Sequence, residues 1–200
     1  MGNGPKSRFS PPFFSQTPVQ QVLFKEGDRQ DPANYRPVSI LPILYKLFSR
    51  IVHGRVKECL GKAQSEDQAG IRPGFCCEDH LFTFTQLQEK CDEWGLELWL
   101  VAVDFEKAFD TIEHEAIWQA LASQGVPNKV IQVFKHLYGG QQGTVGGDRV
   151  SRKFAIGRGS RQGDPISPAL FNAVLEEVFR KLKTKWREEG KGLTVGQRRG

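Results

Sequence analysis

Apolar positions along the chain predict five helices separated by polar connections that contain glycine and proline. From residue 41 to about Leu60, apolar residues recur every three or four positions, the period of an amphipathic helix. Gly95 marks the C-cap of a second such segment, and Pro127 sits where the first turn of a later helix accepts it. The four further helices are predicted at residues 81–94, 113–123, 127–137 and 167–187.

Residues 97–105 predict a strand instead of a helix. The run from Leu98 to Val103 is apolar without alternation, which is typical of a strand buried on both faces. Residues 139–157 hold six glycines and short β-prone pieces around Val145 and 154–156, a pattern consistent with a hairpin. The first twenty residues are rich in Pro, Ser, Gly and Gln, and they predict no fixed structure.

Size and composition exclude a membrane-spanning helix and favour an intracellular protein. The 200 residues suffice for one domain or part of a larger one. The longest apolar run covers six residues, whereas a membrane helix needs about 20. The N-terminus lacks the basic segment and apolar core of a secretory signal. Four cysteines with no C-x-x-C pair favour a reduced compartment.

Cys76, Cys77 and His80 raise the question of a zinc site. A fourth ligand at a recognisable spacing is lacking. Ordinary packed or loop cysteines are therefore the favoured interpretation.

Positive charge gathers at the C-terminal end of the chain. The net charge is +5, and residues 180–200 contain eight basic and two acidic residues. Such a stripe suits a polyanion such as nucleic acid. The alternative is a solvated helix face and tail without a partner.

Asp104 follows the predicted strand directly, and Asp110 comes six residues later. A carboxylate at the end of a buried strand can reach a metal ion at the edge of a sheet, and Mg²⁺ prefers oxygen ligands. Two-metal phosphoryl transfer uses such carboxylates to hold ions about 4 Å apart. The alternative is that Asp104 caps the strand and Asp110 caps the next helix.

The second motif is a polar loop, residues 159–164, which opens into the helix predicted at 167–187. Gly163 permits close approach of a ligand to the backbone, and Gln162 offers an amide to a base or sugar edge. The N-terminal N–H groups of the helix favour anions. Alone, the loop could also be an ordinary connection with Pro165 in the first helical turn.

Taken in order, these motifs resemble the reverse transcriptase domain of non-LTR (LINE-type) retrotransposons. Several ordered motifs at family-like spacings are more specific than any one of them, and they cover about residues 22–200. The stretches that carry the resemblance are 23–29 (Leu-Phe-Lys-Glu-Gly-Asp-Arg), 34–39 (Asn-Tyr-Arg-Pro-Val-Ser), 45–48 (Tyr-Lys-Leu-Phe), 68–74 (Gln-Ala-Gly-Ile-Arg-Pro-Gly), 104–110 and 159–171.

The resemblance implies an α+β fold: a right-hand polymerase without its thumb, with an incomplete palm sheet. Residues 22–96 would form a fingers-like region and residues 97–200 a partial palm, with residues 1–21 unmatched. The implied activity is RNA-directed DNA polymerase, with Mg²⁺ or Mn²⁺ as cofactor. The implied partners are an RNA template, a DNA primer and a dNTP, with no membrane. The parent element would act in the nucleus, because copying into chromosomes takes place there.

The resemblance also assigns roles to the site residues. Asp104 would be catalytic and a metal ligand, together with the backbone carbonyl of Phe105. Phe109 stands where the family has the aromatic residue that clashes with a ribose 2′-OH, although a packing role is the alternative. Gln162 and Gly163 would line the nucleotide and template pocket.

Basic residues complete the implied site. Arg72 resembles the fingers arginine that contacts the triphosphate, and a bidentate guanidinium suits phosphate. Nucleic-acid contacts with weaker grounds are Arg36, Lys46 and Arg161.

Two departures from the family pattern affect these expectations. Phe75 stands where the family usually has another arginine. The chain also contains no Asp-Asp pair, the motif that supplies the second metal-binding carboxylate. Residues 192–196 resemble the approach to that motif, so truncation is expected. We therefore expect no measurable polymerase activity from these 200 residues alone.

Three other hypotheses stay open at this stage. The chain could be a nucleic-acid-binding remnant without chemistry, or it could fail to fold alone because an incomplete palm sheet exposes its edge. A two-metal nuclease is a more distant alternative, because the 159–171 motif has no purpose there.

Overall fold

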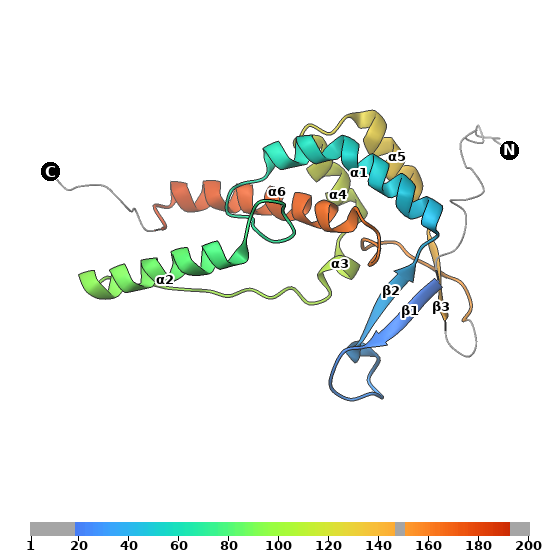
Figure 1. The fold of residues 1–200 in the computed structure, drawn as a ribbon, viewed down its shortest axis with the longest axis horizontal. Coiled ribbons are helices and arrows are strands. Elements are labelled where there is room, and N and C mark those ends of the chain that lie inside the picture. Colours follow the sequence, from blue (N-terminus) through green and yellow to red (C-terminus); the bar gives the residue numbers. More distant parts are fainter. Residues whose placement is uncertain (1–18, 147–150, 193–200) are drawn as a thin grey trace.

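The computed structural model describes residues 19–146 and 151–192, and over these ranges the chain forms six α-helices and a four-stranded sheet (Figure 1). The strands are β1 (Val19–Phe24), β2 (Tyr35–Ile40), β3 (Gln142–Gly146) and β4 (Phe154–Ala155), with a 3₁₀ helix, η1 (Pro32–Asn34), between the first two. The helices are α1 (Ile43–Ala63), α2 (Cys77–Trp94), α3 (Ala108–Thr111), α4 (His114–Ser123), α5 (Asn128–Tyr138) and α6 (Ser167–Glu188).

The five predicted helices are confirmed as α1, α2, α4, α5 and α6. Gly95 ends α2 in the left-handed conformation, with φ of 64°, as its C-cap position predicts. The helix α5 begins directly after Pro127. The helix α2 begins at Cys77, four residues before the apolar pattern indicates, because acidic residues fill its exposed first turn.

The sheet has the strand order β2-β1-β3-β4 and brings together segments far apart in the sequence. β1 pairs antiparallel with β2 and parallel with β3, so that Val19 lies beside both Ile40 and Thr144. β3 and β4 form the predicted hairpin, with Gln142 opposite Ala155. The strands β1 and β2 were not predicted, and β1 begins within the first twenty residues; residues 1–18 lie outside the described ranges.

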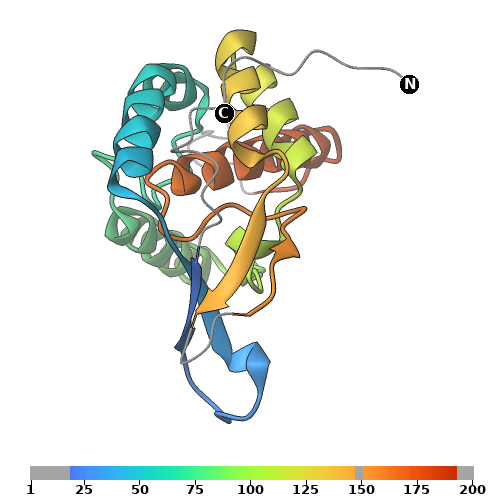
Figure 2. The same cartoon turned by 90° about the vertical axis from the view of Figure 1, so that its right-hand side faces the viewer.

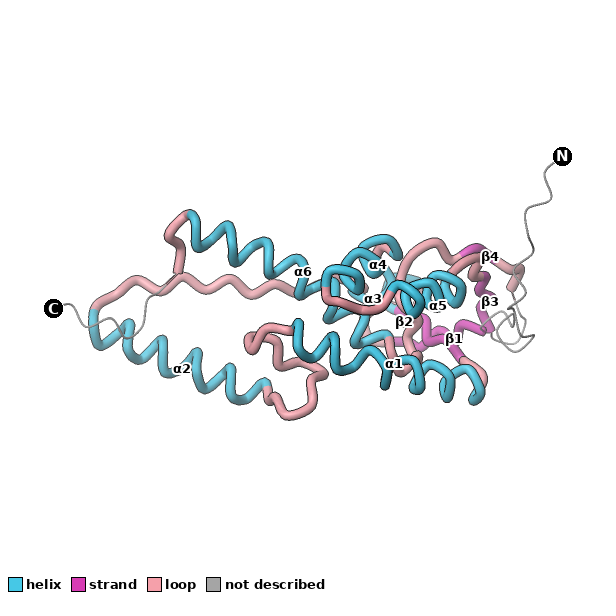
Figure 3. The backbone as a smooth tube through the Cα atoms, turned by 90° about the horizontal axis from the view of Figure 1, so that it is seen from above, coloured by secondary structure: helices cyan, strands magenta, loops and turns pink. Residues whose placement is uncertain are grey.

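The strand predicted at residues 97–105 is wrong. In the described chain this segment is irregular, and no backbone hydrogen bond joins residues 97–106 to another residue. Trp99 and Val101 are 87% and 82% exposed. The segment runs back from the far end of α2 to α3 without a neighbouring strand (Figures 1 and 3). Apolar composition alone does not make a strand, because each strand needs a partner for its N–H and C=O groups.

The hydrophobic core lies between α1, α4, α5 and the first half of α6. Ile117, Leu121, Phe134 and Leu170 are among its large, fully buried side chains, and Val56 joins them from α1. The sheet lies at one end of this helical body, while α2 and the second half of α6 extend towards the other end (Figures 1 and 3). Figure 2 views the molecule from the end at which the sheet lies. None of the helices in the described ranges is long and apolar enough to cross a membrane.

Candidate functional site

The two sequence motifs meet at a pair of adjoining cavities. The first, which we call the motif cavity, has a volume of about 600 Å³ and is lined by Asp104, Phe109, Asp110 and Gln162, with Arg36 from β2. The second, the sheet cavity, has a volume of about 400 Å³ and lies against the β1, β2, β3 and β4 strands. Four residues line both cavities: Tyr35, Lys107, Asp110 and Gln162. The fold therefore brings residues from both motifs to one place.

Backbone hydrogen bonds fix the 159–163 loop between α3 and β2. The Gly159 N–H donates to the carbonyl of Ile112 at 2.7 Å, and the Ser160 N–H donates to the carbonyl of Phe109 at 2.6 Å. On the other side, the N–H of Ser39 in β2 donates to the carbonyl of Gln162 at 2.8 Å. The loop is thus held at both ends, which gives Gln162 a defined position.

Gly163 makes the approach to β2 possible. Its φ is 105°, and a Cβ added there would lie 2.9 Å from the carbonyl oxygen of Ser39. A side chain would therefore both strain the backbone and push β2 away. Gly163 is not among the residues that line either cavity. The lack of a side chain at Gly163 thus explains the close approach of the loop to β2. A role of Gly163 beside a ligand stays a prediction.

Gln162 and Asp110 contact each other where the two cavities adjoin. The side-chain nitrogen of Gln162 lies 3.1 Å from Oδ1 and 3.0 Å from Oδ2 of Asp110. Burial raises the pKa of the Asp110 carboxyl, and the Gln162 hydrogen bond and the Lys107 charge oppose that rise. This pair links the two motifs directly, a contact that the sequence did not predict.

Asp104 lies in the wall of the motif cavity and is exposed. The oxygen donors expected for a divalent ion, the Asp104 carboxylate and the Phe105 carbonyl, are of the kind that Mg²⁺ prefers. Within the described ranges, no group of three or more His, Cys, Asp or Glu side chains is placed to hold a metal ion, and this includes Cys76, Cys77 and His80. The two oxygen donors therefore suit Mg²⁺ in their chemistry. Water or phosphate oxygens would have to supply the remaining ligands of the ion.

The position of Phe109 is compatible with both roles considered for it. Its ring is half-buried and tilted against the ring of Phe171 in α6, with 5.1 Å between the centroids. It also lines the motif cavity. Packing thus holds the ring in the cavity wall, and selection against a ribose 2′-OH stays a prediction.

Arg72 is not brought to the cavities. Its guanidinium donates to the carbonyl of Ser65 at 2.5 Å and lies 3.8 Å above the ring of Phe75. Neither Arg72 nor Phe75 lines the motif cavity or the sheet cavity. The phenylalanine that departs from the family pattern thus holds Arg72 by a cation–π contact in the loop after α1.

The weaker nucleic-acid candidates differ in position. Arg36 is exposed and lines the motif cavity. Lys46 is half-buried on α1 and lines neither cavity. Their contacts with nucleic acid stay predictions, and the geometry favours Arg36.

Arg161 lines the sheet cavity but also ties together three elements of the fold. It donates to the carbonyl of Leu137 at 2.7 Å and to Oε1 of Gln141 at 3.2 Å. Its guanidinium lies 4.9 Å from the ring of Tyr45 and 5.2 Å from that of Tyr138. These contacts occupy much of the guanidinium, which is half-buried.

Asp164 is a structural centre that the sequence analysis missed. Its carboxylate is 3% exposed and accepts hydrogen bonds from the Tyr45 hydroxyl, at 2.7 Å, and from the Ser49 hydroxyl. It also accepts from the Ile166 N–H at the start of α6. Burial raises the pKa of Tyr45, which keeps its hydroxyl a donor. An acidic residue just before a helix was the available signal.

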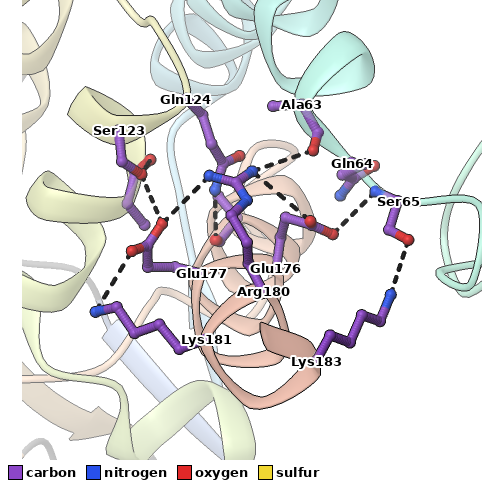
Figure 4. A network of polar contacts seen from close by, with 12 residues as sticks. Ala63, Gln64, Ser65, Ser123, Gln124, Glu176, Glu177, Arg180, Lys181 and Lys183 are labelled. Carbon is purple, nitrogen blue, oxygen red and sulfur yellow. Dashed lines mark hydrogen bonds and ion pairs between the residues drawn. The ribbon is translucent and has the colours of Figure 1, made fainter. Parts of the chain in front are cut away.

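The basic stripe of α6 is largely paired with acidic residues (Figure 4). Arg180 lies 3.7 Å from Glu176 and 3.6 Å from Glu177, and Lys181 lies 3.4 Å from Glu177. Lys183 pairs with Asp67. The predicted basic stripe began at residue 180 and so left out Glu176 and Glu177, one helical turn earlier, which pair with its first basic residues. Residues 193–200 of the predicted stripe lie outside the described ranges.

Comparison with known proteins identifies related sequences over most of the chain. The sequence model of the family described as Reverse transcriptase (RNA-dependent DNA polymerase) matches residues 24–197. This range includes both cavity-lining motifs.

The curated relatives are proteins of mobile elements. The chain is 30% identical over 178 residues to the Retrovirus-related Pol polyprotein from type-1 retrotransposable element R2 of Popillia japonica, covering 88% of this chain and 24% of the relative. It is 30% identical over 175 residues to the Transposon TX1 uncharacterized 149 kDa protein of Xenopus laevis, covering 87% of this chain and 13% of the relative. For the R2DM Pol polyprotein of Drosophila melanogaster the identity is 27%, over 77% of this chain and 14% of the relative. The chain thus spans a quarter or less of these relatives.

Proposed function

This chain belongs to the reverse transcriptase (RNA-dependent DNA polymerase) family, of the kind found in non-LTR retrotransposons, and we propose that it provides part of an RNA-directed DNA polymerase site. The substrates would be a dNTP, a DNA primer and an RNA template. In this proposal residues 22–96 are the fingers-like region and residues 97–200 a partial palm. The observation that carries the proposal is the motif cavity, where Asp104, Phe109 and Gln162 meet although they come from two separate motifs.

The motif cavity offers both signs of charge. Its lining includes the cationic side chains Lys25, Arg36 and Lys107 and the carboxylates Glu26, Asp104, Glu106 and Asp110. The cations would contact the triphosphate, and the carboxylates make a divalent ion necessary beside it. Cationic side chains attract the triphosphate, and guanidinium groups bind phosphate oxygens in pairs. Phe109 would stand against the sugar, and Gln162 would offer its amide to the sugar or base.

Asp104 and the Phe105 carbonyl would hold Mg²⁺ or Mn²⁺. Bound there, the ion would offset the negative charge of the triphosphate and of the reacting oxygens. The side chains of this chain would bind and orient the nucleotide beside it. In the 200-residue polypeptide tested alone, Asp104 is the one carboxylate assigned to the ion, and losing one electrostatic contact in such sites costs about 10²–10³ in rate. We therefore expect nucleotide binding without measurable primer extension.

A second candidate function is nucleic-acid binding without chemistry. It is favoured by the cationic side chains of Lys25, Arg36 and Lys107 at the motif cavity, which phosphate groups of any nucleic acid could contact. It predicts salt-dependent affinity for RNA, because phosphate contacts release counterions, and it predicts no Mg²⁺-dependent affinity for a dNTP.

Calorimetric titration of the 200-residue chain with dATP, with and without Mg²⁺, tests the proposal. We expect Mg²⁺-dependent binding that weakens at least about tenfold in Asp104→Ala, because the metal loses its charged ligand. Asp92→Ala, which removes an exposed carboxylate on α2 far from the cavities, should bind as the wild type does. Equal dATP affinity in wild type and Asp104→Ala would contradict the proposal. Primer extension by the wild-type chain that is lost in Asp104→Ala would contradict the expectation of inactivity.

A further inference from the structure

The carboxylate of Asp110, in the first motif, contacts the side chain of Gln162, a candidate nucleotide-binding residue of the second motif. We propose that Asp110 is a positioning residue, which orients the Gln162 amide so that its carbonyl oxygen faces the nucleotide. This inference rests on the proposed function, because it deepens the role of Gln162 in the same site. It assigns Asp110 a role that differs from helix capping and from metal binding.

Backbone hydrogen bonds hold both residues of the Asp110–Gln162 pair in place. The carbonyl of Gln162 accepts from Ser39 in β2, while the N–H of Asp110 donates to the carbonyl of Lys107 at 2.8 Å. One residue before Asp110, the carbonyl of Phe109 accepts from the N–H of Ser160. Both side chains are half-buried. Because the two main chains are tied together, the pair is held in register and does not depend on two free surface side chains meeting.

The chemistry of the pair selects one orientation of the amide. A glutamine amide presents a donor at one end and an acceptor at the other, and the two ends have nearly the same shape. An ionised carboxylate only accepts hydrogen bonds, so Asp110 requires the nitrogen of Gln162 to face it, at 3.0 and 3.1 Å.

The opposite end of the amide is then left for a ligand. Within the described ranges, no protein donor contacts the side-chain oxygen of Gln162. Gln162 lines both the motif cavity and the sheet cavity. Its oxygen is therefore available to a donor on the nucleotide, such as a hydroxyl or amino group.

The direction in which dATP affinity changes when Asp110 loses its charge distinguishes the positioning role from a direct electrostatic effect of Asp110 on the triphosphate. If Asp110 acted only by its charge, removing that charge would strengthen the binding of an anionic triphosphate. If Asp110 acts through Gln162, the same change weakens binding, because the amide then adopts both orientations. Asp110→Asn keeps the shape of the side chain. It no longer favours one orientation of the Gln162 amide, since the asparagine amide can both donate and accept.

The test is a double-mutant cycle on dATP affinity in the presence of Mg²⁺, using wild type, Asp110→Asn, Gln162→Met and the double variant. Methionine keeps the length of Gln162 and removes its amide. We expect Asp110→Asn to weaken binding about three- to tenfold, the range for one hydrogen bond. In the Gln162→Met background, Asp110→Asn should have no further effect. Independent, multiplying effects or stronger binding by Asp110→Asn would overturn the inference.

A second readout does not need the nucleotide. The side-chain amide signal of Gln162 in ¹⁵N–¹H NMR spectra is identified by its absence in Gln162→Met. We expect this signal to move in Asp110→Asn. It should stay unchanged in the matched control Glu113→Gln, which removes an exposed carboxylate three residues away. An unmoved signal in Asp110→Asn would overturn the inference while wild-type dATP binding still supports the proposed function. A wild-type chain that binds no dATP would overturn both.

Discussion

The two segments that meet in the motif cavity are built in opposite ways. The 159–164 loop is fixed by backbone bonds to α3 and β2, and its last residue, Asp164, is buried. The 97–106 segment has no backbone hydrogen bond within the described ranges and exposes most of its apolar side chains. Both segments carry candidate site residues, yet only the 159–164 loop is held by backbone hydrogen bonds, whereas the other segment packs on α6 through the ring of Phe105.

This difference shows what an apolar pattern can and cannot establish. A helix closes its own hydrogen bonds, so its period in the sequence is enough to predict it. A strand depends on a neighbour, which can lie anywhere in the chain. Asp104 sits at the end of a segment with a strand-like sequence and no neighbouring strand in the described structure, whereas Gln162 sits in a loop that is hydrogen-bonded to β2 and to the residues around α3.

Replacing Asp164, in the hydrogen-bonded 159–164 loop, should give the largest loss of stability. In Asp164→Ala the buried hydroxyls of Tyr45 and Ser49 lose this acceptor, and α6 loses a contact to its first turn. Each buried polar group left without its partner costs about 1–3 kcal/mol, so we expect a loss of about 3 kcal/mol in the free energy of unfolding. Urea denaturation measures it. Asp92→Ala on α2 is the control, and a loss below about 1 kcal/mol in Asp164→Ala would contradict the assigned role.

Gly163→Ala should destabilise the chain by about 2 kcal/mol, because the positive φ and the Ser39 carbonyl both oppose a Cβ. Gly61→Ala is the matched control, and it should change the stability in the opposite direction. Gly61 lies inside α1 with nothing within 4 Å of the added Cβ. Alanine there should stabilise by about 0.5–1 kcal/mol. Similar urea midpoints for the two variants would show that the loop is not held against β2 as described.

Arg161→Lys should cost about 1–2 kcal/mol, although it keeps the positive charge. A lysine cannot bond the Leu137 carbonyl and the Gln141 side chain together while stacking on Tyr45. Arg50→Lys, at an exposed position on α1, is the control and should change stability by less than about 0.5 kcal/mol. Equal urea midpoints for the two variants would mean that the charge alone matters at residue 161.

Trp99→Ala should have the smallest effect, because the side chain is 87% exposed. Large aromatic side chains in a core cost about 3–5 kcal/mol on truncation, whereas here we expect a change within about 0.5 kcal/mol. Hydrogen exchange should be fast throughout residues 97–106 and slow in α5 and α6. Strong protection of the Val101 amide would show that this segment has a partner in solution.

The helical part of the fold was predictable because its information is local. The periods of α1, α4, α5 and α6 and the stop at Gly95 are all visible in the sequence. The strands β1 and β2 were missed because they carry polar residues and a proline, and because pairing with distant strands decides their structure.

The candidate site was predictable only where residues of a recognised motif line the cavity. Asp104, Phe109, Gln162 and Arg36 were all named from the sequence, and they line one cavity. The Asp110–Gln162 contact was not predicted, because it joins residues fifty-two positions apart through the packing of α3 against the loop. The paired charges of α6 were missed because a count of charges ignores neighbours one helical turn away.

The parallel pairing of β1 with β3 sets an order of events for folding. β1 and β2 are neighbours in the chain and can form a hairpin early, whereas β3 is made only after α1 to α5. Closing so long a loop is entropically costly until the helices have packed and shortened the distance. The sheet that walls the sheet cavity is therefore expected to assemble last, and the rate of that step would limit how soon a newly synthesised chain acquires its site.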